Sequence, residues 1–311
     1  MFDQMDANTF NNLFVERLDT PEGITKTAAA GSAFVRAVMR EVAFSRRILP
    51  PESVTRADCQ RSTQHDTLIK IVDIEPNSRA FAINFRGEAE DSYVQGKRYA
   101  LPFFKIESQK FQKQEAELLA YDFPITKVIE ENSVKDLQAV EDSKFIQYAQ
   151  SAVNLTTKTV TPVGATIVNR THITSLSKLI NYDKLAVGVL LMNVADHDDW
   201  LVQPATDIGS PLASEMTVSG YKYDSIMKKK LVVTNKASVN GLPCVPAGTI
   251  WAFTEPAYLG NFFILNDTKF WIKKEADMII WKTWEYIAEG FGNIRSIAKL
   301  VLPGVVAPIV P

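Results

Sequence analysis

Cysteine and histidine, the residues that most often build metal and redox sites, are scarce in this 311-residue chain. It has two cysteines, Cys59 and Cys244, and three histidines. The cysteines lie far apart and have no Cys or His at the spacing of zinc ligands. The sequence therefore favours buried thiols in a reducing compartment, and it leaves open a disulfide between the two.

An excess of charge of one sign is also missing. Lys and Arg number 34 against 36 Asp and Glu, so the formal net charge is −2. Such a chain has no overall field that would hold nucleic acid or an anionic membrane. A local basic face stays open. The run Lys228-Lys229-Lys230 is too short for a convincing nucleic-acid patch, and we interpret it as the solvated start of a strand.

No segment has the pattern of a signal peptide or a membrane span. Residues 1–12 are acidic and rich in amides, without a cationic start or an apolar centre. Residues 300–311 are apolar, but they are few and contain Pro303, Pro308 and Pro311. We expect a protein of the cytosol that does not contact membranes.

Catalytic patterns are absent as well. There is no Gly-x-Ser-x-Gly elbow, and Gly290-Phe291-Gly292 lacks the third glycine of a phosphate loop, so we interpret it as a turn between strands. The run Asp196-His197-Asp198-Asp199 contains side chains that can bind a metal ion, but consecutive residues of a helix point in different directions and cannot converge on one ion. An acidic first turn of a helix explains it better. We expect no catalytic residue, no cofactor and no metal.

What is present is an ordinary globular composition, with 46% hydrophobic and 23% charged residues. Apolar periodicity predicts a short helix over 9–18, a helix over 27–49 with Phe34, Val38 and Val42 on its apolar side, and a long helix over 133–154. Ser133 and Asp136 resemble a capping box at the start of the long helix, and Glu141, Asp142 and other charged residues fill its polar side. A helix of about 20 residues is about 30 Å long.

The second half mixes helices and strands. We expect helices over 171–182, capped by Thr171, and over 196–202, and a doubly buried strand over 186–192. Further strands are expected over 215–219, 230–233, 248–253 and 262–265, and final strands over 269–280, 282–288 and 296–302. The predicted fold class is α+β.

Residues 66–153 are the most informative part. The strand-like runs 67–75, 79–86 and 99–111 carry charges even on the side that should pack, and a charged loop over 87–98 separates the last two. A ribbon with so little apolar surface is marginally stable alone. We therefore expect it to lie on a neighbouring copy of the protein, which points to assembly before catalysis.

The order of these parts resembles the major capsid protein of tailed double-stranded DNA bacteriophages, which has the Hong Kong 97 fold. The resemblance runs from about residue 27 to 303. It is carried by IEENSVKDL at 129–137, like the start of the family's spine helix; VLLMN at 189–193, like a buried strand of its axial domain; DIGSPL at 207–212, like its turn with Asp, Gly and Pro-Leu; VSGY at 218–221; and FGN at 291–293 with IAKL at 297–300, like its closing strand.

The resemblance implies a particular division of the chain. It gives an N-terminal arm (1–48), the start of a peripheral domain (49–65), an E-loop hairpin (66–118), the peripheral domain with the spine helix (119–170), an axial domain (171–265), a return through the peripheral domain (266–292), and a closing strand with the C-terminus (293–311). Such subunits form the hexamers and pentamers of an icosahedral shell around packaged DNA.

The resemblance also implies the partners. These are other copies of the chain, a separate scaffolding protein, a portal, a decoration protein, and double-stranded DNA touched without sequence specificity on the inner face. The place of the protein would be the virion capsid, assembled in the cytoplasm of a bacterial host. Some relatives join subunits by a Lys–Asn isopeptide bond. Lys97 is placed loosely like such a lysine, but no partner Asn or catalytic acid can be matched.

Two other interpretations stay open. One is an encapsulin-type compartment that uses the same fold to enclose enzymes, and the other is a soluble α+β enzyme built on 196–199. For the capsid interpretation, we expect opposed charges to place the hairpin on its neighbour. Each exposed pair contributes at most about 1 kcal/mol. The expected contact residues between subunits are Arg86, Glu88, Glu90, Asp91, Lys97 and Arg98.

Overall fold

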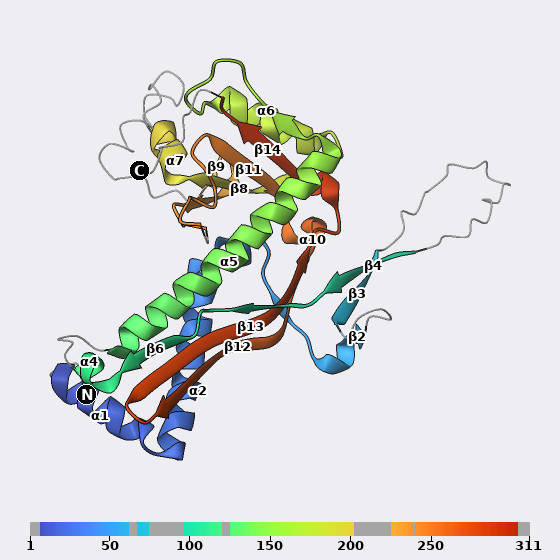
Figure 1. Cartoon of the computed structure of the whole chain (residues 1–311). Helices are drawn as coiled ribbons and strands as arrows, with labels where there is room; N and C mark the ends of the chain where they lie inside the picture. The colour runs from blue at the N-terminus through green and yellow to red at the C-terminus, as the bar shows by residue number, and fades with distance from the viewer. Residues whose placement is uncertain are drawn as a thin grey trace, which may run out of the picture.

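A computed structural model of the chain describes residues 7–61, 67–74, 96–119, 125–201, 225–238 and 240–303. Figure 1 shows an elongated molecule in which the long helix α5 (Ile125–Thr156) runs between a lower body and an upper sheet. Parallel and antiparallel strand pairs occur together with helices, which confirms the expected α+β class. Among the described residues, no helix combines the length and the apolar character needed to cross a membrane.

The lower body is built on one long hairpin. β12 (Asn261–Glu275) and β13 (Met278–Gly290) pair antiparallel in a sheet of order β1-β12-β13-β5, with β6 also on β13. The helix α2 (Pro21–Val42) packs along β12, where a Cβ at Gly31 would lie 2.7 Å from the Phe270 ring. The other elements of this body are α1 (Ala7–Leu18), α3 (Phe44–Ile48), β1 (Glu52–Ser53), β5 (Phe104–Glu107), β6 (Phe111–Gln114) and α4 (Glu115–Leu119).

The upper sheet has six strands in the order β7-β14-β11-β8-β10-β9. The strand β8 (Val187–Asn193) is central, and its two faces belong to different cores: Leu190 packs with α6, while Leu191 packs with α5. This confirms the strand predicted to be buried on both faces. The remaining elements are β7 (Thr159–Val160), α6 (Arg170–Asn181), α7 (Val194–Leu201), β9 (Ser225–Ile226), β10 (Lys229–Thr234), β11 (Thr249–Thr254), α10 (Pro256–Leu259), the 3-10 turn η2 (Ile294–Ser296) and β14 (Ile297–Val301).

A third, small sheet carries the base of the predicted hairpin. After the 3-10 turn η1 (Arg56–Asp58), β2 (Gln60–Arg61), β3 (Leu68–Ile74) and β4 (Lys97–Pro102) pair antiparallel, and Figure 1 shows β3 and β4 leaving the side of the body below α10. The single strand predicted over 99–111 was wrong. It is divided among β4, β5 and β6, because the chain passes from the small sheet to β13 at the buried residue Phe103.

The predicted helix over 27–49 was wrong in its limits and its buried side. Helix α2 begins at Pro21 after the cap Thr20, and Ala43 (φ −70°, ψ 122°) separates it from α3. Val35 and Met39 are fully buried, whereas Phe34 is 38% exposed. The apolar stripe is therefore one position away from the predicted one, because Gly31 and Met39 lie on the side that faces β12.

The start predicted for the long helix at Ser133 was also wrong. Helix α5 begins eight residues earlier, so Ser133 lies in its interior, fully buried, and its Oγ has no hydrogen-bond partner in the described structure. Residues 125–132 contain no helix breaker, and the helix continues through them. The side predicted to be polar is wrong at Glu141 and Asp142, which are both buried, and right at Glu131 and Lys135, which are exposed.

Two further boundaries differ from the predictions, and one predicted strand is not tested. Helix α6 is capped by Asn169, whose side chain accepts a hydrogen bond from His172 N, and not by Thr171. The predicted strands 262–265 and 269–280 merge into one strand, β12, which ends at Glu275. The hairpin turns at Ala276-Asp277 instead of near Trp281, so residues 278–280 belong to β13. The predicted strand 215–219 lies outside the described residues.

Candidate assembly site and its supporting ion cluster

Two of the residues expected to contact a neighbouring subunit, Lys97 and Arg98, lie at the first positions of β4. Lys97 is exposed opposite Ile74, and Arg98 Nε lies 2.5 Å from Asp73 Oδ1 on β3. Both partners of this ion pair have side chains that are 72% exposed, so solvent and salt weaken it. The other four expected contact residues, Arg86, Glu88, Glu90 and Asp91, lie outside the described residues.

The base of the hairpin is fixed to the body by two side chains of β4. Tyr99 donates a hydrogen bond from its hydroxyl to Asn261 Oδ1 at 2.6 Å, and Leu101 packs on Gly290. A Cβ at Gly292 would lie 2.8 Å from the Tyr99 oxygen, and one at Gly290 would lie 2.3 Å from Leu101. The Gly290-Phe291-Gly292 run is therefore the turn between strands that the sequence predicted. Its two end glycines leave the space that Leu101 and Tyr99 of the hairpin base occupy.

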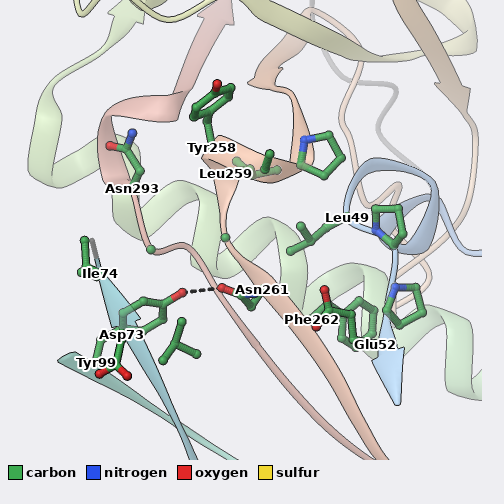
Figure 2. A pocket seen from close by; sticks show the side chains of 17 residues that line it. Leu49, Glu52, Asp73, Ile74, Tyr99, Tyr258, Leu259, Asn261, Phe262 and Asn293 are labelled. Atoms are coloured by element: carbon green, nitrogen blue, oxygen red, sulfur yellow. Dashed lines mark hydrogen bonds between the residues drawn. The ribbon is translucent and has the colours of Figure 1, made fainter. Parts of the chain in front are cut away.

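Above this attachment lies a groove of about 730 Å³, which we call the junction groove. Figure 2 shows its walls: Asp73, Ile74 and Tyr99 from the hairpin, Tyr258 and Leu259 from α10, and Glu52 opposite. Three prolines, at positions 50, 51 and 256, complete much of its lining. The groove is concave and lined by apolar and polar groups in similar amounts, a mixture that recognition surfaces often have.

Behind the groove, α3, α5 and the long hairpin meet at a buried ion cluster centred on Arg46. The Arg46 side chain is only 3% exposed, and its Nη2 lies 2.6 Å from Glu141 Oε2 and 2.8 Å from Glu285 Oε1. Arg46 Nε adds a second bond to Glu141 at 2.9 Å, and Thr268 Oγ1 donates to Glu285 at 3.0 Å. One guanidinium thus joins a helix of the N-terminal region, the long helix and the hairpin.

The cluster contains more acid than base. Asp142 accepts from Ser45 N at 3.0 Å and from Gln138 Nε2 at 2.6 Å, while both carboxylate oxygens of Glu289 are buried without a hydrogen-bond partner among the described residues. Burial, followed by repulsion from Glu141, raises the pKa of Asp142 to about 7 and also raises the pKa of Glu285, although Arg46 opposes this shift at Glu285.

The pKa of Glu289 is raised for the same physical reasons. Burial first, and then the charges of Glu141 and Asp142, raise its pKa well above the ordinary value. For Arg46, burial alone would lower the pKa, but the two carboxylates together raise it. The cluster therefore holds protons near neutral pH, since a single arginine cannot balance several buried carboxylates.

This cluster was not predicted from the sequence. Glu141 was predicted on the solvated side of the long helix, because charged residues are rarely buried unless paired. One signal was available: Glu141-Asp142 interrupts the stripe between Val140 and Phe145, so a straight helix that packs on both sides must bury it. The partners are 95 and 239 residues apart in sequence, and no spacing rule joins them.

The acidic run at 196–199 has a structural role. Asp196 lies in the first turn of α7, where its Oδ1 accepts from Gly248 N at 2.7 Å, and burial raises its pKa to about 6. The side chains of Asp198 and His197 lie 3.9 Å apart at the surface. In the described part of the chain, no three His, Cys, Asp or Glu side chains converge as metal ligands, and both cysteines are free thiols.

No protein-family model and no curated protein sequence matches this chain. Solved structures do. A chain of the capsid structure of cyanophage P-SCSP1u superposes with a TM-score of 0.57 at 9% identity, over 81% of this chain and 86% of that one. A chain of Microbacterium phage Oxtober96 gives 0.56 at 13% identity over 84% and 91%. A chain of the capsid of a native GTA particle gives 0.51 at 10% identity over 83% and 89%. This chain therefore has the Hong Kong 97-type capsid fold.

Proposed function

We propose that this chain is the major capsid protein of a tailed bacteriophage, whose copies assemble as hexamers and pentamers into an icosahedral shell around double-stranded DNA. The observation that carries the proposal is the extent of the likeness, which covers more than four fifths of this chain and of the P-SCSP1u capsid chain. The hairpin base supports it, because β3 and β4 leave the body with charged and exposed residues at their ends.

The proposed division of the chain follows the resemblance. In this division, α1, α2 and α3 form the N-terminal arm (1–48), β3 and β4 belong to the E-loop (66–118), and α5 is the spine helix. The six-stranded sheet contributes the axial domain (171–265) together with the closing strand β14. The extended β12–β13 hairpin would then be the return through the peripheral domain, with its first residues still assigned to the axial part.

The proposed partners are other copies of the chain, with a separate scaffolding protein, a portal and a decoration protein. Packaged DNA would lie against the inner face without sequence-specific contacts. The net charge of −2 fits a shell that encloses dense DNA without binding it tightly. The proposed location is the virion capsid, assembled in the cytoplasm of the host.

Electron microscopy of the purified chain, expressed alone and with the neighbouring phage genes, tests the proposal. We expect closed shells or capsomer rings of uniform size, because each copy completes its apolar surface on the next. Sedimentation velocity gives the mass in parallel. A chain that stays monomeric at high concentration under both conditions would contradict the proposal, and shells filled with a cargo enzyme would favour the encapsulin alternative.

A further inference from the structure

The turn between β9 and β10 has an unusual backbone. Met227 and Lys228 both occupy the left-handed region, with φ values of 51° and 63°. A two-residue hairpin turn of this kind normally uses Asn-Gly, because residues with larger side chains are strained there by about 1–2 kcal/mol each. Both side chains point into solvent, and Met227 is 40% exposed. The turn therefore holds an exposed methionine at a position where smaller residues are usual.

The next residues make this turn strongly basic. Lys228 and Lys230 are exposed, Lys229 is half-buried, and Lys230 Nζ donates to Arg47 O at 3.3 Å, which holds the turn beside α3. Within the described residues, no carboxylate forms an ion pair with any of the three lysines. We call residues 227–230 the lysine turn. It offers an apolar tip flanked by positive charges.

The junction groove has the complementary chemistry. Tyr258 is 60% exposed on α10, Ile74 is 40% exposed on the hairpin, and the Glu52 carboxylate is exposed in the opposite wall (Figure 2). The flexible side chain of a methionine adapts well to a surface lined by proline and tyrosine. A lysine ammonium is attracted both by the face of a tyrosine ring and by a carboxylate.

In its own copy the lysine turn does not line the junction groove, although Lys230 contacts Arg47, five residues before Glu52. Lys230 pairs with Val189, Val189 with Phe253, and Phe253 with Ile297, so the lysine turn and η2 lie at the same end of the sheet but three strands apart. Three strand spacings amount to about 14 Å. The α10 wall is nearer, because α10 follows β11, two strands from β10. Cross-linking therefore has to distinguish a contact between copies, which links two chains, from a contact within one copy, which does not.

We propose that the lysine turn of one copy docks in the junction groove of the next copy, with Met227 against Tyr258 and a lysine beside Glu52. Because the two surfaces differ, the contact is head-to-tail, and a head-to-tail contact closes into rings when the rotation between copies permits. This inference rests on the proposed function and names the contact that joins neighbouring copies within a capsomer. DNA is the weaker candidate, because three lysines give few phosphate contacts and Met227 gives none.

Cross-linking tests the contact directly. In a Cys59→Ser background, a chain carrying Met227→Cys and Tyr258→Cys is assembled, oxidised with copper phenanthroline and separated in denaturant without reductant. We expect a ladder of disulfide-linked multimers. Each single variant should give no ladder, because the contact is not self-complementary. The control pair is Met227→Cys with Tyr182→Cys, which uses a tyrosine that is 89% exposed on the α6 end, outside the groove. Particles that form normally but give no ladder would overturn the contact.

A charge exchange provides the second test. Lys228→Glu should lower the yield of particles at least tenfold, and adding Glu52→Lys should restore it. Lys178→Glu, at an exposed position of α6, is the matched control and should assemble normally. Normal particle formation by Lys228→Glu would overturn the contact but not the proposed function. If those particles also retained less DNA, the turn would bind nucleic acid instead. A wild-type chain that stays monomeric overturns the proposed function and the contact together.

Discussion

Arg46 and Arg47 are neighbours in sequence with opposite surroundings. Arg46 is buried between Glu141 and Glu285, while Arg47 is exposed. Arg46→Met leaves the two buried carboxylates without their cation, and breaking a buried ion pair from one side costs about 3–5 kcal/mol. We expect that loss in the free energy of unfolding measured with urea at pH 8, because the carboxylates are then most charged.

Arg47→Met is the matched control, and its exposed position predicts a loss below about 1 kcal/mol. If both variants unfold at the same urea concentration as the wild type, the ion cluster does not stabilise the fold. If both lose stability equally, the effect belongs to α3 as a whole and not to the buried guanidinium.

The raised pKa of Asp142 makes stability depend on pH. The carboxyl has an ordinary pKa of 3.8 and a pKa of about 7 in the folded chain, so between these values the folded state holds a proton that the unfolded state has released. Its contribution to the free energy of unfolding is therefore complete below pH 3.8 and is lost as the pH rises through about 7. Glu285 and Glu289 act in the same direction.

Asp142→Asn removes this titration and keeps the geometry, because an amide oxygen still accepts from Ser45 N and Gln138 can turn its amide to accept from the new NH₂ group. We expect the free energy of unfolding to fall less between pH 5.5 and pH 8 than in the wild type, as urea titrations at several pH values would measure. An unchanged pH dependence would mean that Asp142 is ionised throughout this range.

At the scale of elements, the long helix does not begin at the residue that the capping rule predicted. Ser133 was predicted to cap a helix, and loss of a cap costs about 1 kcal/mol. It lies instead inside α5 with its buried Oγ unpartnered in the described structure, and an unsatisfied buried hydroxyl is unfavourable. Ser133→Ala should therefore leave the unfolding midpoint unchanged or raise it.

Asn169 is the comparison residue, because it caps α6 and accepts from His172 N at 2.9 Å. Asn169→Ala should lower the free energy of unfolding by about 1 kcal/mol. Thermal or urea unfolding of the two variants side by side would distinguish the cases. A loss for Ser133→Ala as large as that for Asn169→Ala would show that α5 begins at Ser133 in solution.

Elements were predictable where local pattern decides them. The apolar run of β8 identified a strand buried on both faces, and the periodicity of α1 and α6 identified helices within two residues of their ends. The division of 99–111 was not predictable, because a strand that passes from one sheet to another keeps its propensity throughout. The extension of β12 past Leu265 likewise depends on its partner β13 and on α2.

At the scale of the whole molecule, the prediction concerns assembly. Reversing Lys97 and Arg98 together to Glu should stop or misdirect shell formation while leaving the subunit folded, because both side chains lie exposed at the base of the hairpin. Each pair contributes at most about 1 kcal/mol, but the contact is repeated in every copy of a shell. Particle yield by sedimentation and folding by circular dichroism measure the two effects separately.

Reversal of two exposed lysines away from the hairpin and the lysine turn, Lys178 and Lys184, is the control for net charge. Normal particles from the Lys97 and Arg98 variant would show that the hairpin does not use these charges. Loss of particles from the control as well would assign the effect to overall charge and not to the hairpin.

The sequence by itself determined the α+β class, the buried strand β8, the long helix and the charged hairpin base, because these features depend on periodicity and composition over short stretches. Only the tertiary structure decided that Arg46, Glu141 and Glu285 share one buried site, that Gly290 and Gly292 receive the hairpin, and that a groove lies above Tyr99. The physical reason is distance along the chain: these contacts join segments 95 to 239 residues apart in the ion cluster and 162 apart between Tyr99 and Asn261, where no local pattern records the partner.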